Sequence, residues 1–473
     1  MTRRKFLETA PIAAATVSVV GNKTFGQSNP TANNTHANSP LDPEIINKVR
    51  TFITENYASA YQNFKRLDAV PEILFDLPKT AKIVQENLQS IPGVEIHEGL
   101  APCSFVAVLK NGTGKTVGYR TDLDGLKVET TRQDSWLGNK KSYPNSHSCG
   151  HSTHCQLALS ICKFFAENKS LWSGTAIFLF QSSEEGGNPE LGSGAQCLIR
   201  NGLFTKFPIP VDGLLAVHVA PDLAVGKVRL RSGIAFAHAT LFHIKVKGIA
   251  GHGGAPYKGA IDSILLASRI VCALQSIVSR ELSPLEEQAV ISIGAMHGGD
   301  AGNAIPKEVI LKGTTRCFSE AVFEKVKAAI QRICNGEASA AGLSQEQYPE
   351  VNFDPTYAQQ LYNDPSLGAH LKTIYTSVLG EPAIEIASQP VTFGEDFAAY
   401  HLLSPDKKVP IFMTWLGSVN PAKFDAAGIP IEILPPLHNG DFTPYWNENA
   451  EMDTFRVGVM TQTCALLALF RDK

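Results

Sequence analysis

Two near-continuous apolar runs, Thr175–Phe180 and Gly213–Val219, constrain the fold of this chain most strongly. Apolar runs without alternation are typical of strands that are buried on both faces, as in parallel sheets covered by helices. Residues 42–66 repeat their apolar side chains at helical spacing, and a second amphipathic segment follows residue 154. The sequence therefore predicts an α/β fold, in which a mixed, mostly parallel sheet is flanked by helices.

A different pattern begins near residue 236. Residues 240–247 alternate apolar and polar side chains, as in an antiparallel strand with one wet face. We expect the whole segment to follow the order β-α-β-β-α-β, which is ferredoxin-like. Because 473 residues are too many for one core, we expect a catalytic domain formed by 41–235 and 355–473, with 236–354 inserted between its halves.

The composition argues against several classes of protein. The formal net charge is −3 and no long basic run occurs, so nucleic-acid binding has no electrostatic support. No apolar stretch of about 18 residues occurs, so we expect no membrane-spanning helix. The nine cysteines are odd in number and scattered, which does not suggest a disulfide framework.

The N-terminus carries the pattern of a targeting segment. Residues 3–7, Arg-Arg-Lys-Phe-Leu, precede a weakly apolar run at 10–20, and this order resembles a twin-arginine export signal. We expect residues 1–27 to be that signal, 28–40 to be a flexible linker, and the protein to be periplasmic. A disordered basic tail is the alternative.

Polar side chains follow the predicted strands. Asp122 and Asp124 come after one strand, Glu184 and Glu185 after the next, and His218 near the end of a third. Ligands of open α/β sheets bind beyond the carboxyl ends of the strands, so these side chains should converge at one edge. Adjacent carboxylates repel each other, and a cation between them would relieve that repulsion. One glutamate could then bind metal while the other takes a proton from water.

The loop 143–154 holds three histidines and a cysteine. Cys149 and His151 are separated only by Gly150, so a sulfur and an imidazole nitrogen can face one metal ion. A surface loop with a buried cysteine and stray histidines is the alternative. His438 lies in a second loop flanked by proline and glycine, and His252 lies in a glycine-rich loop of the insert.

Taken together, these motifs resemble the M20 metallopeptidase family, and within it the amidohydrolase branch of hippurate hydrolases, N-acyl-amino-acid amidohydrolases and auxin-conjugate hydrolases. The similarity covers roughly residues 42–473 and rests on the order and spacing of eight motifs. They are Asp122-Leu123-Asp124-Gly125-Leu126, Cys149-Gly150-His151-Ser152-Thr153-His154, Ser183-Glu184-Glu185, Ala216-Val217-His218, Gly251-His252-Gly253, Asn303-Ala304-Ile305-Pro306, Gly313-Thr314-Thr315-Arg316 and Leu437-His438-Asn439.

The resemblance implies a site for two divalent ions, Mn²⁺ or Zn²⁺, with Glu184 as general base and then acid. It implies that Asp124 orients the site and that His252 helps to hold the tetrahedral intermediate, often across a dimer interface. Asn303 and Arg316 match positions near the substrate carboxylate or the oxyanion. The implied metal ligands are Cys149, His151, Glu185, His218 and His438.

The implied function is a metal-dependent amidohydrolase that cleaves N-acyl or N-aroyl amino acids by attack of a metal-bound hydroxide. The insert would serve as a lid and dimerisation domain, which predicts a homodimer. Two alternatives stay open. One is an aminopeptidase, carboxypeptidase or dipeptidase of the same fold, and the other is a non-catalytic binding protein that retains the fold.

The chain departs from the family pattern at two positions. Ser152 stands where the family usually has Asp, and Lys127 stands where it commonly has Pro. A serine can accept a hydrogen bond or cap the following helix, but it brings no charge. We therefore expect weaker electrostatic support for the site at this point.

Overall fold

The structure is a computed structural model, and it describes residues 41–138, 140–354 and 358–471. The expected signal at 1–27 and the expected linker at 28–40 lie outside the described residues.

The core of the molecule is an eight-stranded sheet in the order β1-β2-β4-β3-β7-β18-β8-β17. Strands β4, β3, β7 and β18 pair parallel with one another, while β2 pairs antiparallel with β4 and β8 pairs antiparallel with β18. The predicted mixed, mostly parallel sheet is therefore confirmed. The strands are β1 (Glu95–His97), β2 (Phe105–Asn111), β3 (Lys115–Asp122), β4 (Gly174–Gln181), β7 (Leu214–Ala224), β8 (Val228–Leu230), β17 (Ile384–Ile386) and β18 (Ile411–Val419).

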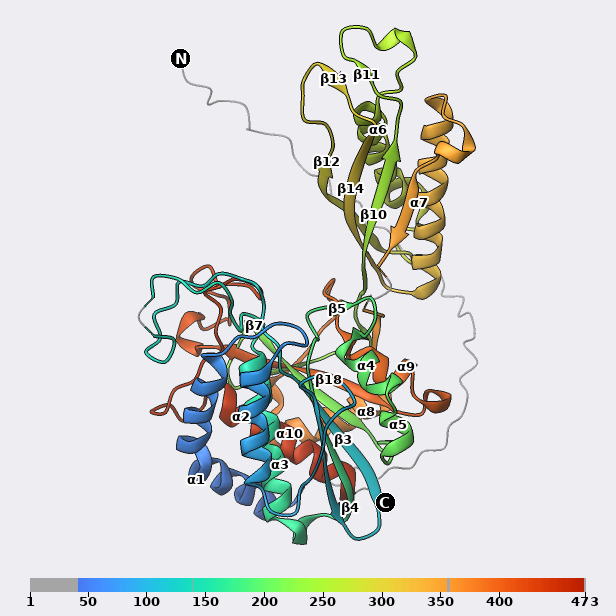
Figure 1. The fold of residues 1–473 in the computed structure, drawn as a ribbon. Helices are drawn as coiled ribbons and strands as arrows, with labels where there is room; N and C mark the ends of the chain where they lie inside the picture. Colours follow the sequence, from blue (N-terminus) through green and yellow to red (C-terminus); the bar gives the residue numbers. More distant parts are fainter. Residues whose placement is uncertain (1–40, 139, 355–357, 472–473) are drawn as a thin grey trace, which may run out of the picture. The chain divides into compact units, whose positions relative to one another are not determined.

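Helices cover both faces of this sheet (Figure 1). One face packs against α1 (Pro43–Asp68), α2 (Pro78–Gln89), α3 (His151–Glu167), α8 (Pro365–Leu379) and α10 (Thr454–Arg471). The other face packs against α4 (Gly194–Arg200), α5 (Leu203–Lys206) and α9 (Ala399–Leu402). Successive side chains of β2 alternate between the two cores, since Ala107 faces the first and Val106 the second. Burial on both faces explains why these strands read as unbroken apolar runs.

The insert has a core of its own. Its strands pair antiparallel in the order β12-β14-β10-β15, and α6 (Ser263–Ser276) and α7 (Glu320–Ala340) pack on the sheet through apolar side chains. The chain order β-α-β-β-α-β is the ferredoxin-like order expected from the sequence. The strands are β10 (His238–Lys247), β12 (Ala289–His297), β14 (Glu308–Cys317) and β15 (Glu350–Phe353).

Two further observations bear on the sequence predictions. All nine cysteines lie within the described residues and are free thiols. Among the described residues, one helical segment, Ser263–Glu281, is long and apolar enough to cross a membrane by length and composition, with a mean hydropathy of 1.3. Its side chains Leu266, Ile270 and Leu274 are buried in the core of the insert.

Candidate metal centre and catalytic site

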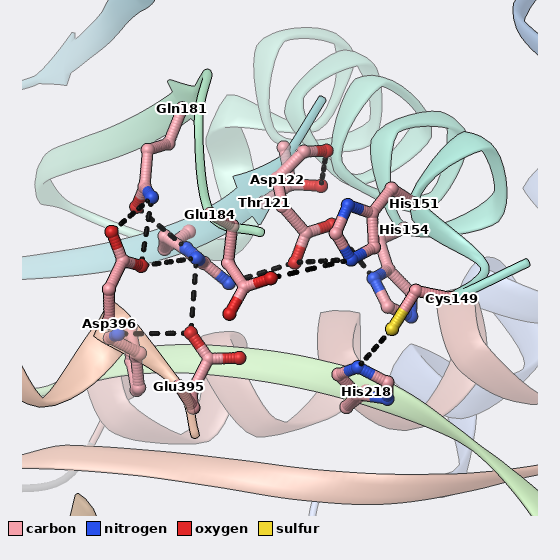
Figure 2. Close-up of polar contacts among 12 residues, drawn as sticks. Thr121, Asp122, Cys149, His151, His154, Gln181, Glu184, His218, Glu395 and Asp396 are labelled. Carbon is pink, nitrogen blue, oxygen red and sulfur yellow. Dashed lines mark hydrogen bonds and ion pairs between the residues drawn. The ribbon is translucent and has the colours of Figure 1, made fainter. Parts of the chain in front are cut away.

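Three parallel strands bring the polar side chains to one edge of the sheet. Asp122 is the last residue of β3, Glu184 follows β4, and His218 lies on β7 (Figure 2). The loop that carries Cys149 reaches the same edge because Gly150 has a φ of +86° and packs tightly on β7. A Cβ at this position would lie 2.4 Å from Val219 Cγ2, so only glycine fits without a shift.

The five residues proposed as metal ligands form two overlapping groups. Cys149, His151 and His218 make one group, and Cys149, Glu185 and His438 make the other. Within each group the candidate ligand atoms all lie within 4.8 Å of one another. Cys149 Sγ lies 3.3 Å from His218 Nε2, and His438 Nε2 lies 3.3 Å from Glu185 Oε1. Cys149 belongs to both groups, so the two groups form one continuous cluster.

The orientation of His151 fits a metal ligand. Its Nδ1 lies 2.8 Å from the backbone oxygen of Asp124, which fixes the ring. Its buried Nε2 has no hydrogen-bond partner among the described residues. That atom faces Glu185 Oε1 at 3.7 Å and Glu184 Oε2 at 3.8 Å. In metal-binding histidines, the ring nitrogen that does not bind the metal is commonly held by a hydrogen bond to a backbone oxygen or a carboxylate. The thiol, imidazole and carboxylate donors of this cluster suit a divalent transition metal.

The electrostatics of the cluster are dominated by buried acids. Burial works against a charged His151, but the carboxylates of Asp122 and Asp124 outweigh it and raise the pKa of His151 to about 10. Burial, and then the neighbouring carboxylates of Glu395 and Glu185, raise the pKa of Glu184 well above its ordinary value. Without a cation, the protein must therefore hold extra protons at this edge.

Asp124 ties both glutamates to the histidine loop. Its side chain is fully buried, and its two carboxylate oxygens accept hydrogen bonds from the backbone amides of Glu184 at 3.0 Å and Glu185 at 3.1 Å. Because its backbone oxygen also lies against His151, one residue sets the relative positions of three side chains of the cluster.

Sequence reasoning missed an acidic pair beside Glu184. Glu395 and Asp396 offer oxygens that lie within 4.8 Å of a Glu184 oxygen. Arg120 is fully buried and its guanidinium contacts Asp396 at 2.9 Å, Glu395 at 3.1 Å and Asp122 at 2.9 Å. Burial raises the pKa of Glu395 to about 7, against the opposing effect of Arg120. The only sequence signal was the adjacent pair of acids after Gly394.

His154 belongs to the same loop, and the sequence alone predicts no role for it. Its Nδ1 lies 2.8 Å from Asp122 Oδ1, and its Nε2 accepts a hydrogen bond from the backbone amide of Val219 at 3.0 Å. His154 therefore joins β3, α3 and β7 at the edge where the cluster forms, and its second nitrogen is already occupied.

The remaining predicted residues lie in the insert rather than in the cluster. His252 and Asn303 are neighbours, since β11 (Gly251–His252) pairs with β13 (Ala304–Ile305) and the Gly253 amide donates to the backbone oxygen of Asn303 at 2.8 Å. Both side chains are exposed. Arg316 lies on β14, and its Nε donates to the backbone oxygen of Thr392 at 2.9 Å, shortly before Glu395.

The sequence profile of peptidase family M20/M25/M40 matches residues 118–432, which is more than half of the chain. The chain belongs to peptidase family M20. The family and the enzyme class predicted from the sequence are thereby confirmed, and the protein is an M20 hydrolase.

Relatives of this M20 enzyme cover most of its length. It is 28% identical to the IAA-amino acid hydrolase ILR1-like 4 of Arabidopsis thaliana, over 82% of this chain and 81% of the relative. It is 33% identical to the N-acetyldiaminopimelate deacetylase of Bacillus licheniformis, over 75% of this chain and 88% of the relative. Its fold matches the YXEP protein of Bacillus subtilis, a dinuclear metal-binding M20 peptidase, with a TM-score of 0.65, 22% identity, and coverage of 89% of this chain and 98% of that one.

The buried arginine provides a test of the electrostatic network in this M20 enzyme. Arg120→Met would leave three buried carboxylates without their cation, and we expect a loss of about 3–5 kcal/mol in the free energy of unfolding. Denaturant titration followed by circular dichroism measures this loss. Arg229→Met is the matched control, because Arg229 also pairs with two acids, Asp222 and Glu385, but both of these acids are exposed. The control should lose at most about 1 kcal/mol, and an equal loss in both variants would contradict the account.

Proposed function

We propose that this M20 enzyme is an amidohydrolase that cleaves N-acyl or N-aroyl amino acids and depends on two divalent metal ions. The observation that carries the proposal is the position of Glu184, a largely buried carboxylate of raised pKa that lies beside two of the five candidate ligands, His151 and Glu185. The relatives support the choice of substrate, since one is named a hydrolase of IAA-amino acids and another a deacetylase of N-acetyldiaminopimelate.

The cluster divides into residues that would hold the ions and residues that would handle protons. Mn²⁺ or Zn²⁺ would lower the pKa of a water molecule and polarise the amide carbonyl. Asp124 would fix the positions of Glu184, Glu185 and His151 relative to one another through its hydrogen bonds to the two backbone amides and its contact with the His151 ring. The ions would be held by Cys149, His151, Glu185, His218 and His438.

Glu184 would act as general base and then as general acid. A carboxylate whose pKa lies well above its ordinary value can take a proton from water and return it to the leaving amine. The acidic pair Glu395 and Asp396 lies beside Glu184, and Arg120 balances that pair from the other side. The negative charge of the neighbouring carboxylates therefore favours proton binding by Glu184, which a residue that takes up and releases a proton requires.

The insert would complete the site. We propose that His252 stabilises the oxyanion of the tetrahedral intermediate and that Asn303 and Arg316 contact the substrate carboxylate or the oxyanion. The exposure of His252 and Asn303 in one paired turn suits contact with a substrate or with a second copy of the chain. A homodimer through the insert is part of this proposal, and light scattering should then give twice the chain mass of 51.1 kDa.

Export is a separate proposal that rests on the pair Arg3-Arg4. We expect the protein to be recovered from the periplasm of a bacterial host that has the twin-arginine pathway. Replacing both arginines by lysine should keep it in the cytoplasm. Periplasmic recovery of the doubly substituted protein would contradict a twin-arginine signal.

The substrate class is tested with metal-free protein and a small panel of amides. We expect metal-dependent release of the amino acid from N-acetyl, N-benzoyl or N-indoleacetyl amino acids, measured by amine detection after Mn²⁺ or Zn²⁺ is added. Free dipeptides are the comparison. Faster cleavage of free dipeptides would favour a peptidase of the same fold. The absence of both metal binding and turnover of any amide would favour the binding-protein alternative, whereas metal binding without turnover would point to a substrate outside the panel.

The role of Glu184 is tested by Glu184→Gln. We expect kcat to fall about 100-fold or more, because a general base contributes on that scale, while the metal content stays that of the wild type. Glu190→Gln changes an exposed acid of the same loop region and should keep full activity. Wild-type turnover by the Glu184 variant would rule out this residue as the base.

A further inference from the structure

A buried carboxylate reaches the turn that carries His151. Ser152 follows His151 in the first turn of α3, and its hydroxyl donates to Asp68 Oδ1 at 3.1 Å. Asp68 is the last residue of α1 and lies 84 positions earlier in the chain. Its exposed fraction is 3%, and that of Ser152 is 1%. The contact therefore excludes water and joins the end of one helix to the start of another.

Asp68 is held firmly by two other donors. Its Oδ2 accepts hydrogen bonds from Arg132 Nη2 at 2.9 Å and from Trp136 Nε1 at 2.8 Å. Burial opposes the ionisation of Asp68, but Arg132 outweighs it and the pKa of Asp68 lies below its ordinary value. Ser152 therefore meets a charged acceptor whose position is fixed by its other oxygen.

The first turn of α3 lacks a side-chain cap, and its other contacts with the rest of the fold come from His151, Thr153 and His154. Its N-cap is Gly150, which has no side chain to accept a hydrogen bond from the free amides of the turn. Ser152 does not act as a cap, since its hydroxyl points to Asp68. A negative charge near the N-terminus of a helix is favourable because of the helix dipole. Ser152 brings no charge of its own, and Asp68 supplies one to the same turn.

We propose that Asp68 is a positioning residue for the metal centre, which acts through Ser152 to fix the first turn of α3 and so the orientation of His151. The inference rests on the proposed function, because it takes His151 as a metal ligand. The partners that orient a metal ligand commonly account for 10–100-fold in metal affinity. Asp68 should therefore matter for metal affinity although it touches no proposed ligand.

The test is the dissociation constant of Zn²⁺ for the full chain, measured by competition with a chromophoric chelator after the metal has been removed. Asp68→Asn should raise this constant about 10-fold or more. The exchange variant, Asp68→Ser together with Ser152→Asp, moves the carboxylate from α1 to α3 and should recover most of the lost affinity. Recovery by the exchange separates positioning from a general loss of stability.

Asp134→Asn is the matched control. Asp134 pairs with the same Arg132, at 2.6 Å, but makes no hydrogen bond to Ser152. Its substitution should leave the Zn²⁺ affinity unchanged. Should Asp68→Asn fail to fold, Ser152→Ala decides the question, because it removes the hydroxyl and keeps the pairing of Asp68 with Arg132 and Trp136. We expect weaker Zn²⁺ binding by Ser152→Ala as well.

Three outcomes would overturn the inference. The first is wild-type Zn²⁺ affinity in Asp68→Asn, which would show that the contact does not serve the metal centre. If Asp68→Asn does not fold, wild-type affinity in Ser152→Ala would show the same. An exchange variant no better than Asp68→Asn would show that the carboxylate acts only on stability. A wild-type protein that binds no Zn²⁺ or Mn²⁺ would overturn the proposed function along with this inference, so the two failures are distinguishable.

Discussion

The balance of buried charge at one edge of the sheet is the constraint on which the rest of the structure depends. Five carboxylates lie close together at this edge, and most of them are buried. They belong to Asp122, Glu184, Glu185, Glu395 and Asp396. Arg120 neutralises part of this charge on one side. On the other side the counter-charge must come from His151 or from bound cations, because isolated buried carboxylates are costly. An edge of this kind is stable in one of two states, protonated or loaded with metal, and the thiol and imidazoles beside it favour the loaded state.

The parallel strands explain why so many acids meet in one place. Strands β4, β3 and β7 are parallel, so the loops that follow them lie at the same edge of the sheet. Because both faces of the sheet are covered by helices, polar side chains gather at that edge. Further residues then lock the loops to the strands. Asp124 holds the two glutamates by their backbone amides, and His154 joins Asp122 to Val219. The cluster is thus built on the loops that follow the strands of the sheet.

The sequence predicted the sheet, the insert and the residues of the cluster, because each of these depends on local signals. Apolar runs mark the strands, alternation marks β10, and short motifs mark Cys149, His151 and His218. It could not predict partners that are close only after folding. Arg120 meets Asp396 across 276 positions and Ser152 meets Asp68 across 84, and neither pair has a local pattern. The uncharged Ser152 therefore predicts a weaker site when only the sequence is considered, whereas the structure places the charged carboxylate of Asp68 against the same turn.

Anomalous diffraction at the zinc edge from crystals of the metal-loaded enzyme would test the central claim most directly. The account predicts two peaks at the edge of the sheet, with Cys149 Sγ at about 2.3 Å from zinc and with His151, Glu185, His218 and His438 as the other protein ligands. Asp68 and His154 should contact neither ion. Peaks at other residues, or a loaded crystal in which the five side chains face no metal, would contradict the account.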